Sequence, residues 1–168
     1  MEIRLNKKDG TEIDFFRELF WLTKSAELKA DEWPEQMKDQ MLSVQRRAFE
    51  QSVIDHFPKA DDFVIQVGSE MAGRLQLNSD NYGLWIINIS LLPAFQRKGI
   101  GTIVLSRLLK EADLSGRPIF LGVDIHNPAF SLYKRLGFEV RSQDELKYTM
   151  RYLPKAAVGD RDDSSVWT

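Results

Sequence analysis

Residues 91–102 read Leu-Leu-Pro-Ala-Phe-Gln-Arg-Lys-Gly-Ile-Gly-Thr, and they join an apolar strand to an amphipathic helix. The strand is predicted over residues 84–92, because Pro93 cannot donate a hydrogen bond to a neighbouring strand. Gly99 and Gly101 have no side chain, so a ligand can approach their backbone N–H groups closely. The first N–H groups of a helix lack partners within it and lie at the positive end of its dipole. This turn therefore predicts an anion site, with phosphate as the favoured anion.

Arg97 and Lys98 add positive charge at the edge of the predicted anion site. The spacing differs from that of a nucleotide-hydrolysing phosphate loop, and it lacks the three glycines of a dinucleotide-binding fingerprint. Gln96, Gly99 and Gly101 instead fit the pattern Gln/Arg-x-x-Gly-x-Gly/Ala. This pattern resembles the pyrophosphate loop of the GNAT superfamily of N-acetyltransferases, which bind acetyl-CoA. A tight strand-to-helix turn also fits so short a pattern, so the rest of the chain has to decide.

A second motif makes the resemblance specific. Residues 127–138 read Asn-Pro-Ala-Phe-Ser-Leu-Tyr-Lys-Arg-Leu-Gly-Phe and follow a buried strand predicted over residues 119–123. They resemble the GNAT segment Asn-x-Ala-x-x-Leu-Tyr-x-x-x-Gly-Phe. Because both motifs occur in the family's order and structural context, the chain is identified as a member of the GNAT superfamily. The matching core covers residues 84–138.

The resemblance implies a mixed α/β (α+β) fold. Its central sheet is mixed and mostly antiparallel, has flanking helices, and is splayed open between two parallel strands, here residues 84–92 and 119–123. We expect a single acetyltransferase domain over residues 1–154, because 168 residues suffice for one domain with a sizeable core and fall short of two. Residues 155–168 are predicted to form a polar C-terminal tail.

The resemblance also implies the cofactor site. The pantetheine arm of acetyl-CoA would pair with the exposed backbone of the first parallel strand around Ile89 and Leu91, as an added strand does. Asn127 matches a family position that contacts the pantetheine or its phosphate end, and it also suits a helix N-cap. The pyrophosphate would rest on backbone N–H groups of the loop, which is formed by Gln96, Arg97, Lys98, Gly99, Ile100, Gly101 and Thr102.

Tyr133 is the predicted catalytic residue, because it matches the position of a tyrosine that the family keeps near the thioester sulfur. A phenol can protonate the departing thiolate as a general acid. The alternative is an aromatic residue of the core whose hydroxyl is hydrogen-bonded. No general base is evident, since residues 84–92 contain no carboxylate. Asn88 and Ser90 share one strand face and can hold a water, Asp124 and His126 are alternatives, and water alone can remove the amine proton.

Composition narrows the class of protein. The chain has 23 basic and 25 acidic residues, with no basic tract, which gives no support for a nucleic-acid partner. It has no cysteine and two histidines, too few for a convincing metal cluster, so no metal is expected. No apolar run approaches the length of a membrane span, and no signal core precedes the first strand. We therefore expect a cytoplasmic enzyme without a membrane partner, with a homodimer left open.

Two helices are expected before the central strands. The first follows Thr11 and Asp14, which resemble a helix start, and its aromatic residues are read as core or, alternatively, as the lining of an acceptor pocket. These residues are Phe15, Phe16, Phe20 and Trp21, with Leu19 and Leu22 beside them. The second is expected over residues 35–55, and its spacing predicts a buried face formed by Met37, Met41, Val44 and Ala48.

The function that these features favour is acetyl transfer from acetyl-CoA to a primary amine by direct attack on the thioester. The acceptor is a small molecule or a peptide. Two alternatives remain: a CoA-binding sensor or interaction domain without catalysis, and an acyltransferase that uses another acyl-CoA or a protein N-terminus. The missing strand carboxylate supports the first, and the aromatic first helix permits the second.

Overall fold

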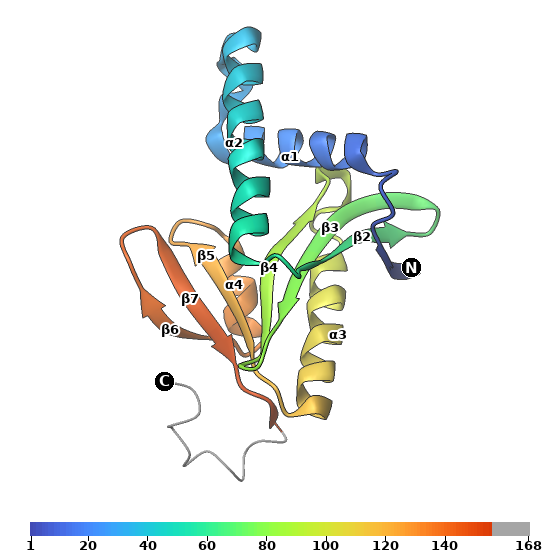
Figure 1. Cartoon of the computed structure of the whole chain (residues 1–168), viewed down its shortest axis with the longest axis vertical. Coiled ribbons are helices and arrows are strands. Elements are labelled where there is room, and N and C mark those ends of the chain that lie inside the picture. The colour runs from blue at the N-terminus through green and yellow to red at the C-terminus, as the bar shows by residue number, and fades with distance from the viewer. Residues whose placement is uncertain (156–168) are drawn as a thin grey trace. The chain divides into compact units, whose positions relative to one another are not determined.

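The computed structural model describes residues 1–155 and forms a mixed α/β fold (Figure 1). Its sheet has the strand order β1-β2-β3-β4-β5-β7-β6. The strands are β1 (Ile3–Lys7), β2 (Asp61–Val67), β3 (Glu70–Ser79), β4 (Leu84–Leu91), β5 (Ile119–Asp124), β6 (Glu139–Gln143) and β7 (Lys147–Tyr152). The helices are α1 (Ile13–Leu28), α2 (Glu35–His56), α3 (Ile100–Ser115) and α4 (Ala129–Arg135), with short 3-10 turns at Ala30–Glu32 and Pro93–Phe95. The predicted fold class is confirmed.

The chain divides into two compact units. The first consists of Met1–Gln76 and Asn88–Ile100, and the second of Leu77–Ile87 and the chain from Gly101 onward. A single domain over residues 1–154 stays a prediction. The predicted tail lies outside the described residues except for Lys155, whose backbone N–H donates to the Asp113 carboxylate at 2.8 Å.

The first unit contains an apolar cluster that joins α1 to the sheet. Phe15, Leu19 and Val64 are buried together, and Leu92 packs against them from the end of β4. The prediction that the aromatic residues of α1 are core is therefore confirmed for Phe15, with Phe16 packed against the cluster. Phe20 and Trp21 are not part of this cluster. The predicted helix start is wrong in detail: α1 follows Glu12, and the Thr11 hydroxyl donates to Asp9 at 2.6 Å.

Helix α2 buries a different face from the one that the sequence predicts. Met37 and Val44 are 50% and 63% exposed, whereas Leu42 is 1% exposed and Val53 is also buried. The buried face is thus rotated by about one residue, or 100°, from the predicted stripe. Many positions of α2 are polar, so hydrophobic spacing alone marks its inner face poorly. His56 ends the helix with its Nδ1 2.9 Å from the Ser52 carbonyl oxygen, consistent with a C-terminal cap.

A buried arginine connects α2 to strands β2 and β3 within the first unit. Arg74 on β3 donates to both oxygens of Asp62, at 2.9 and 2.6 Å, and to Glu50 of α2 at 2.6 Å. Lys8 reaches the same Asp62 carboxylate at 3.3 Å, and the Arg74 guanidinium lies 4.1 Å from the ring centre of Phe16. These ion pairs and hydrogen bonds hold the pKa of Arg74 above its usual range, against the opposing effect of burial.

The second unit contains the predicted parallel pair and the last hairpin. Strands β4 and β5 pair in parallel from Leu84↔Ile119 to Ile86↔Leu121. Strand β7 pairs antiparallel with both β5 and β6. Helix α4 contacts β5, and α3 buries Val104, Leu105 and Leu108. The strand–helix–strand unit that the sequence predicts is therefore confirmed.

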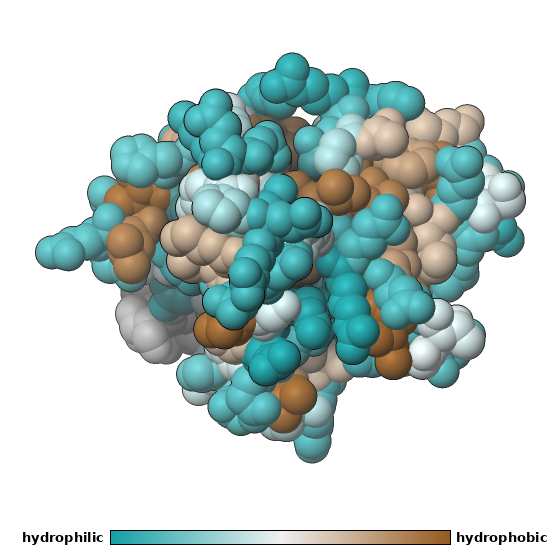
Figure 2. Space-filling view, turned by 90° about the horizontal axis from the view of Figure 1, so that it is seen from above, coloured by the Kyte–Doolittle hydropathy of each residue, from teal (hydrophilic) through white to brown (hydrophobic). Residues whose placement is uncertain are grey.

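Figure 2 shows one face of the molecule, where hydrophilic residues predominate and hydrophobic residues form separate small patches. The exposed large hydrophobic residues include Ile13 of α1 and Met41 and Ile54 of α2. Within residues 1–155, no helix combines the length and the apolar character needed to cross a membrane.

Candidate functional site

The loop between β4 and α3 has the backbone shape of a turn built for a ligand. Gln96 Nε2 donates to the Leu91 carbonyl oxygen at 3.0 Å, which ties the loop back to the strand it leaves. Arg97 has a φ of 60° and Gly99 a φ of 80°. Residues other than glycine rarely adopt this left-handed conformation, and it concentrates at functional sites. The side chains of Arg97 and Lys98 are exposed, so their charges are available to a ligand.

Gly101 tests whether this loop suits a phosphate group. Apart from its chain neighbours and the adjacent backbone of α3, a Cβ atom at Gly101 would meet no protein atom within 4 Å, and the φ of Gly101 is not positive. Neither packing nor backbone strain therefore requires glycine in the first turn of α3, where it costs up to about 1 kcal/mol relative to alanine. A Cβ there would lean toward the helix N-terminus, where the free N–H groups lie. The glycine fits a loop that must leave room for a phosphate.

Ile89 and Leu91, the predicted pantetheine contacts, lie on β4 beyond the register of the parallel pair. Within the first unit, β3 approaches this part of β4 closely at Gly73. A Cβ at Gly73 would collide with the Ser90 carbonyl oxygen and lie 2.8 Å from the Leu91 side chain. The Leu92 N–H donates to the Ala72 carbonyl at 2.8 Å. Backbone contacts with β3 therefore fix the position of the end of β4.

Tyr133 lies on α4, whose ends are both fixed by local hydrogen bonds. Asn127 Oδ1 accepts from the Ala129 N–H at 2.9 Å, so its side chain satisfies a backbone donor at the start of α4, although the N-cap position itself is held by Pro128. Past the other end, Gly137 has a φ of 102°. The Phe138 N–H donates to the Tyr133 carbonyl and the Gly137 N–H to the Lys134 carbonyl, which is the Schellman pattern. Gly137 is therefore the left-handed cap that ends α4.

The Tyr133 ring is buried while its hydroxyl is unpaired. The residue is 8% exposed, packs edge-on against Phe138 at 5.8 Å, and has its pKa raised by burial. No hydrogen bond of its hydroxyl is found within residues 1–155. Ser25 Oγ is the one side-chain polar atom in that part of the chain that is both fully buried and without a partner. The Tyr133 oxygen is not among the fully buried, unpartnered polar atoms of that part of the chain. Its neighbour Tyr152 differs, because its hydroxyl donates to Asp113 at 2.9 Å.

The candidates for a general base are exposed or engaged elsewhere. Asp124 ends β5, and its carbonyl accepts from the Asn127 N–H at 3.0 Å, so this stretch forms the turn into α4. Asp124 and His126 are both exposed. Asn88 Nδ2 donates to the buried Gln76 at 3.4 Å. Within residues 1–155, no group of three or more His, Cys, Asp or Glu side chains is placed to hold a metal ion.

The predicted site residues are divided between the two units. The first unit contains Ile89, Leu91, Gln96, Arg97, Lys98, Gly99 and Ile100, and the second contains Gly101, Thr102, Asn127 and Tyr133. Ile100 is buried at the start of α3, so it contributes a backbone N–H and a core side chain rather than a surface contact.

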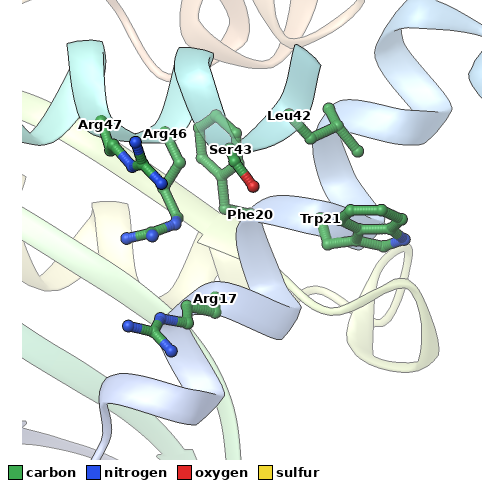
Figure 3. A pocket seen from close by; sticks show the side chains of 7 residues that line it. All are labelled: Arg17, Phe20, Trp21, Leu42, Ser43, Arg46 and Arg47. Carbon is green, nitrogen blue, oxygen red and sulfur yellow. The ribbon is translucent and has the colours of Figure 1, made fainter. Parts of the chain in front are cut away.

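Sequence reasoning missed a hollow between α1 and α2. Its lining comprises Arg17, Phe20 and Trp21 of α1 and Leu42, Ser43, Arg46 and Arg47 of α2 (Figure 3). The aromatic excess of α1 pointed to a pocket as one alternative, and Phe20 and Trp21 do line one. The adjacent Arg46 and Arg47 were the available signal for its positive charge.

Comparison with known proteins decides the family. The model of the acetyltransferase (GNAT) family matches residues 13–138, which is most of the chain and includes both motifs. The chain belongs to the GNAT acetyltransferase family. The probable N-acetyltransferase san of Drosophila melanogaster is 32% identical over 78 residues, or 45% of this chain. The match spans 42% of that relative's length.

Solved structures of GNAT enzymes share the fold. The PaiA N-acetyltransferase of Thermoplasma acidophilum, in complex with coenzyme A, has a TM-score of 0.67 at 19% identity, covering 91% of this chain and 99% of that one. The ribosomal-protein-S18-alanine N-acetyltransferase of Escherichia coli has a TM-score of 0.61 at 18% identity, covering 90% and 94%. The family to which this chain belongs is an acetyltransferase family.

Proposed function

We propose that this GNAT enzyme transfers an acetyl group from acetyl-CoA to a primary amine, and that Tyr133 is its general acid. The observation that supports this role most directly is that the Tyr133 ring is buried while its hydroxyl has no hydrogen-bond partner within residues 1–155. A structural tyrosine of this unit, Tyr152, has its hydroxyl bonded to a carboxylate instead. The E. coli relative supports an amine acceptor, since its name states that it acetylates an alanine of a ribosomal protein.

When bound, acetyl-CoA supplies an activated thioester. The residues of this chain would bind and orient the cofactor and protonate the leaving thiolate. The loop N–H groups from Gln96 to Thr102 hold the pyrophosphate, with Arg97 and Lys98 adding charge. The backbone of β4 around Ile89 and Leu91 aligns the pantetheine, and an N–H in the Leu91 region polarises the thioester carbonyl.

The proposed transfer balances without a metal or a covalent enzyme intermediate. The amine nitrogen bonds to the acetyl carbon as the carbon–sulfur bond breaks. One proton leaves the nitrogen to water or to Asp124 or His126, and Tyr133 gives its proton to the thiolate and regains one from solvent. The absence of a carboxylate from residues 84–92 is the one feature that favours the non-catalytic alternative, and no comparison supports that alternative. Action in the cytoplasm and formation of a homodimer stay predictions.

Calorimetric titration tests the binding half of this proposal. Acetyl-CoA should bind the purified protein more tightly than ATP, because the loop lacks the spacing of a nucleotide-hydrolysing phosphate loop. Equal or tighter binding of ATP, or no binding of acetyl-CoA, would overturn the proposed function.

Gly101→Ala should weaken acetyl-CoA binding about tenfold, or about 1.4 kcal/mol. The added methyl would enter the space in front of the helix N-terminus, whereas the fold should lose nothing because the Cβ meets no atom within 4 Å outside the adjacent backbone of α3. The melting temperature should stay the same or rise, since alanine favours a helix over glycine. Ser106→Ala, an exposed change on the same helix, is the control and should leave the Kd unchanged. A Gly101→Ala protein with wild-type affinity would contradict the assignment of the loop.

A further inference from the structure

The hollow between α1 and α2 brings three arginines to one place within the first unit. It has a volume of about 340 Å³, which is within the range of small binding sites. In Figure 3, the side chains of Arg46 and Arg47 extend from α2 and that of Arg17 from α1, with their guanidinium groups on the same side of Phe20. Trp21 lies at the other end of the hollow.

These three arginines have no carboxylate partner within residues 1–155. None of the ion pairs or side-chain hydrogen bonds in that part of the chain includes Arg17, Arg46 or Arg47. The acidic residue best spaced to pair with Arg46 along α2 is Glu50, four residues later, and Glu50 is bonded to Arg74 at 2.6 Å instead. The hollow therefore has a local excess of positive charge in a chain whose net charge is −2.

The aromatic residues add an apolar surface beside this charge. Phe20 packs against Phe49 at a ring distance of 6.4 Å, which connects the two helices. Trp21 lies under the Lys38 ammonium at 5.4 Å, and both Phe20 and Trp21 stay partly exposed. Guanidinium groups bind carboxylates in pairs of parallel hydrogen bonds, and exposed aromatic rings contact the aliphatic parts of a peptide. Charge and shape together suit an acidic peptide segment.

The hollow is also tied to the loop that would hold the cofactor. Phe15 and Leu19 on the buried side of α1 pack in the cluster against which Leu92 rests, and Leu92 directly follows β4 at the start of the segment that leads to Gln96. Phe20, the next residue after Leu19, lines the hollow. An acceptor held at the hollow would thus rest on a helix that packs against the end of β4.

We propose that this hollow binds the acidic side chains of a peptide acceptor whose amine is acetylated, an inference that rests on the proposed function. Arg17, Arg46 and Arg47 pair with carboxylates of the peptide, and Phe20 and Trp21 contact its apolar groups. Because Arg17 lies on α1 and Arg46 and Arg47 lie on α2, the three guanidinium groups can pair with more than one carboxylate of the peptide.

Three synthetic peptides test this acceptor class. They share a free amino terminus and one lysine, and they differ in a central run that is all Glu, all Gln or all Arg. With acetyl-CoA as donor, the Glu peptide should be acetylated with a kcat/KM about tenfold above that of the Gln peptide at low salt, and the Arg peptide should be the poorest. The ratio of Glu to Gln should fall toward one as added salt screens the charges. The difference should lie mainly in KM.

Variants of the hollow show whether these arginines cause the preference. Arg46→Gln with Arg47→Gln should reduce the Glu-to-Gln ratio to about twofold or less, and Arg17→Gln alone should lower it about threefold. Arg17 is exposed and lies on the other helix, so this single variant keeps the test valid if the double variant folds poorly. Lys110→Gln, an exposed change on α3, should leave the ratio unchanged.

Each outcome separates this inference from the proposed function. Calorimetry with acetyl-CoA is run on every protein: no binding by the wild type overturns the proposed function. Suppose that the wild type binds acetyl-CoA but acetylates the Glu peptide no better than the Gln peptide, or does not acetylate the Glu peptide at all. Either result overturns this inference and leaves the proposed function standing. The inference also fails if the ratio survives the arginine changes, or if those changes weaken acetyl-CoA binding as much as acetylation, because the arginines would then serve the cofactor.

Discussion

Tyr133→Phe should lower kcat by about two to four orders of magnitude, which is the usual contribution of a positioned general acid. The substitution removes one oxygen and keeps the ring that packs against Phe138 at 5.8 Å. Because no described residue bonds to that hydroxyl, its loss should leave the free energy of unfolding close to the wild-type value. The Kd for acetyl-CoA should also stay within about twofold, since the proposed role begins when the thiolate leaves.

The pH dependence of kcat should also report the acid role of Tyr133. A general acid acts in its protonated form, and burial raises the pKa of Tyr133 above the usual phenol value of about 10. The wild-type kcat should therefore persist through the pH range in which an exposed tyrosine would ionise, and it should decline only above pH 10. The residual kcat of Tyr133→Phe should lack this alkaline decline.

Tyr152→Phe is the matched control in the same aromatic group. Its ring packs against Phe138 at 5.8 Å, its hydroxyl donates to Asp113, and its pKa is raised to about 12 by burial and by that carboxylate. Removing the hydroxyl should cost about 1 kcal/mol of unfolding free energy and leave kcat near the wild-type value. If Tyr133→Phe keeps full activity, or if both variants lose activity equally, Tyr133 is not the acid.

Arg74→Met should destabilise the fold by about 3–5 kcal/mol, because it removes one partner of a buried ion pair. The side chains of Arg74 and Asp62 are 7% and 5% exposed. Without the guanidinium, the Asp62 carboxylate would stay buried with Lys8 as its remaining cation, at 3.3 Å. Urea unfolding followed by circular dichroism would measure the loss as a lower transition midpoint with a similar slope.

Two further variants separate the buried pair from the outer one. Glu50 is 33% exposed, so Glu50→Gln should cost about 1 kcal/mol or less. Combining Arg74→Met with Asp62→Leu removes both buried charges and should recover much of the loss, so that the two single changes are not additive. A cost below about 1 kcal/mol for Arg74→Met alone would show that this network contributes little to stability.

Features set by neighbouring residues were predictable from the sequence. The loop from Gln96 to Thr102 and the Gly137 cap depend on backbone conformations that glycine adopts readily, so their pattern identifies them. The parallel pair and the last hairpin follow from apolar runs of strand length separated by turn residues. Together the two motifs were enough to indicate the family.

The inner face of α2 was not predictable in the same way. Met37, Met41 and Val44 have helical spacing, yet the structure buries Leu42 and Val53. Hydrophobic spacing shows that a helix has an apolar stripe, but the neighbours against which it packs decide which side is covered. On α2 the covered side includes polar residues whose partners lie on α1 and β3, and such pairings leave no local pattern in the sequence.

The sequence by itself determined the glycine loop, the order of the two motifs and the family, because each depends on residues that are close together along the chain. Only the tertiary structure decided which partner each polar group has. The spacing of Arg46 and Glu50 suggests a pair along one helix, whereas Glu50 bonds to Arg74 and leaves Arg46 at the hollow. Likewise, Tyr133 and Tyr152 are both buried tyrosines, but the Tyr133 hydroxyl has no hydrogen-bond partner within residues 1–155, whereas the Tyr152 hydroxyl donates to Asp113. Such pairings join residues far apart in sequence, so only packing brings them together.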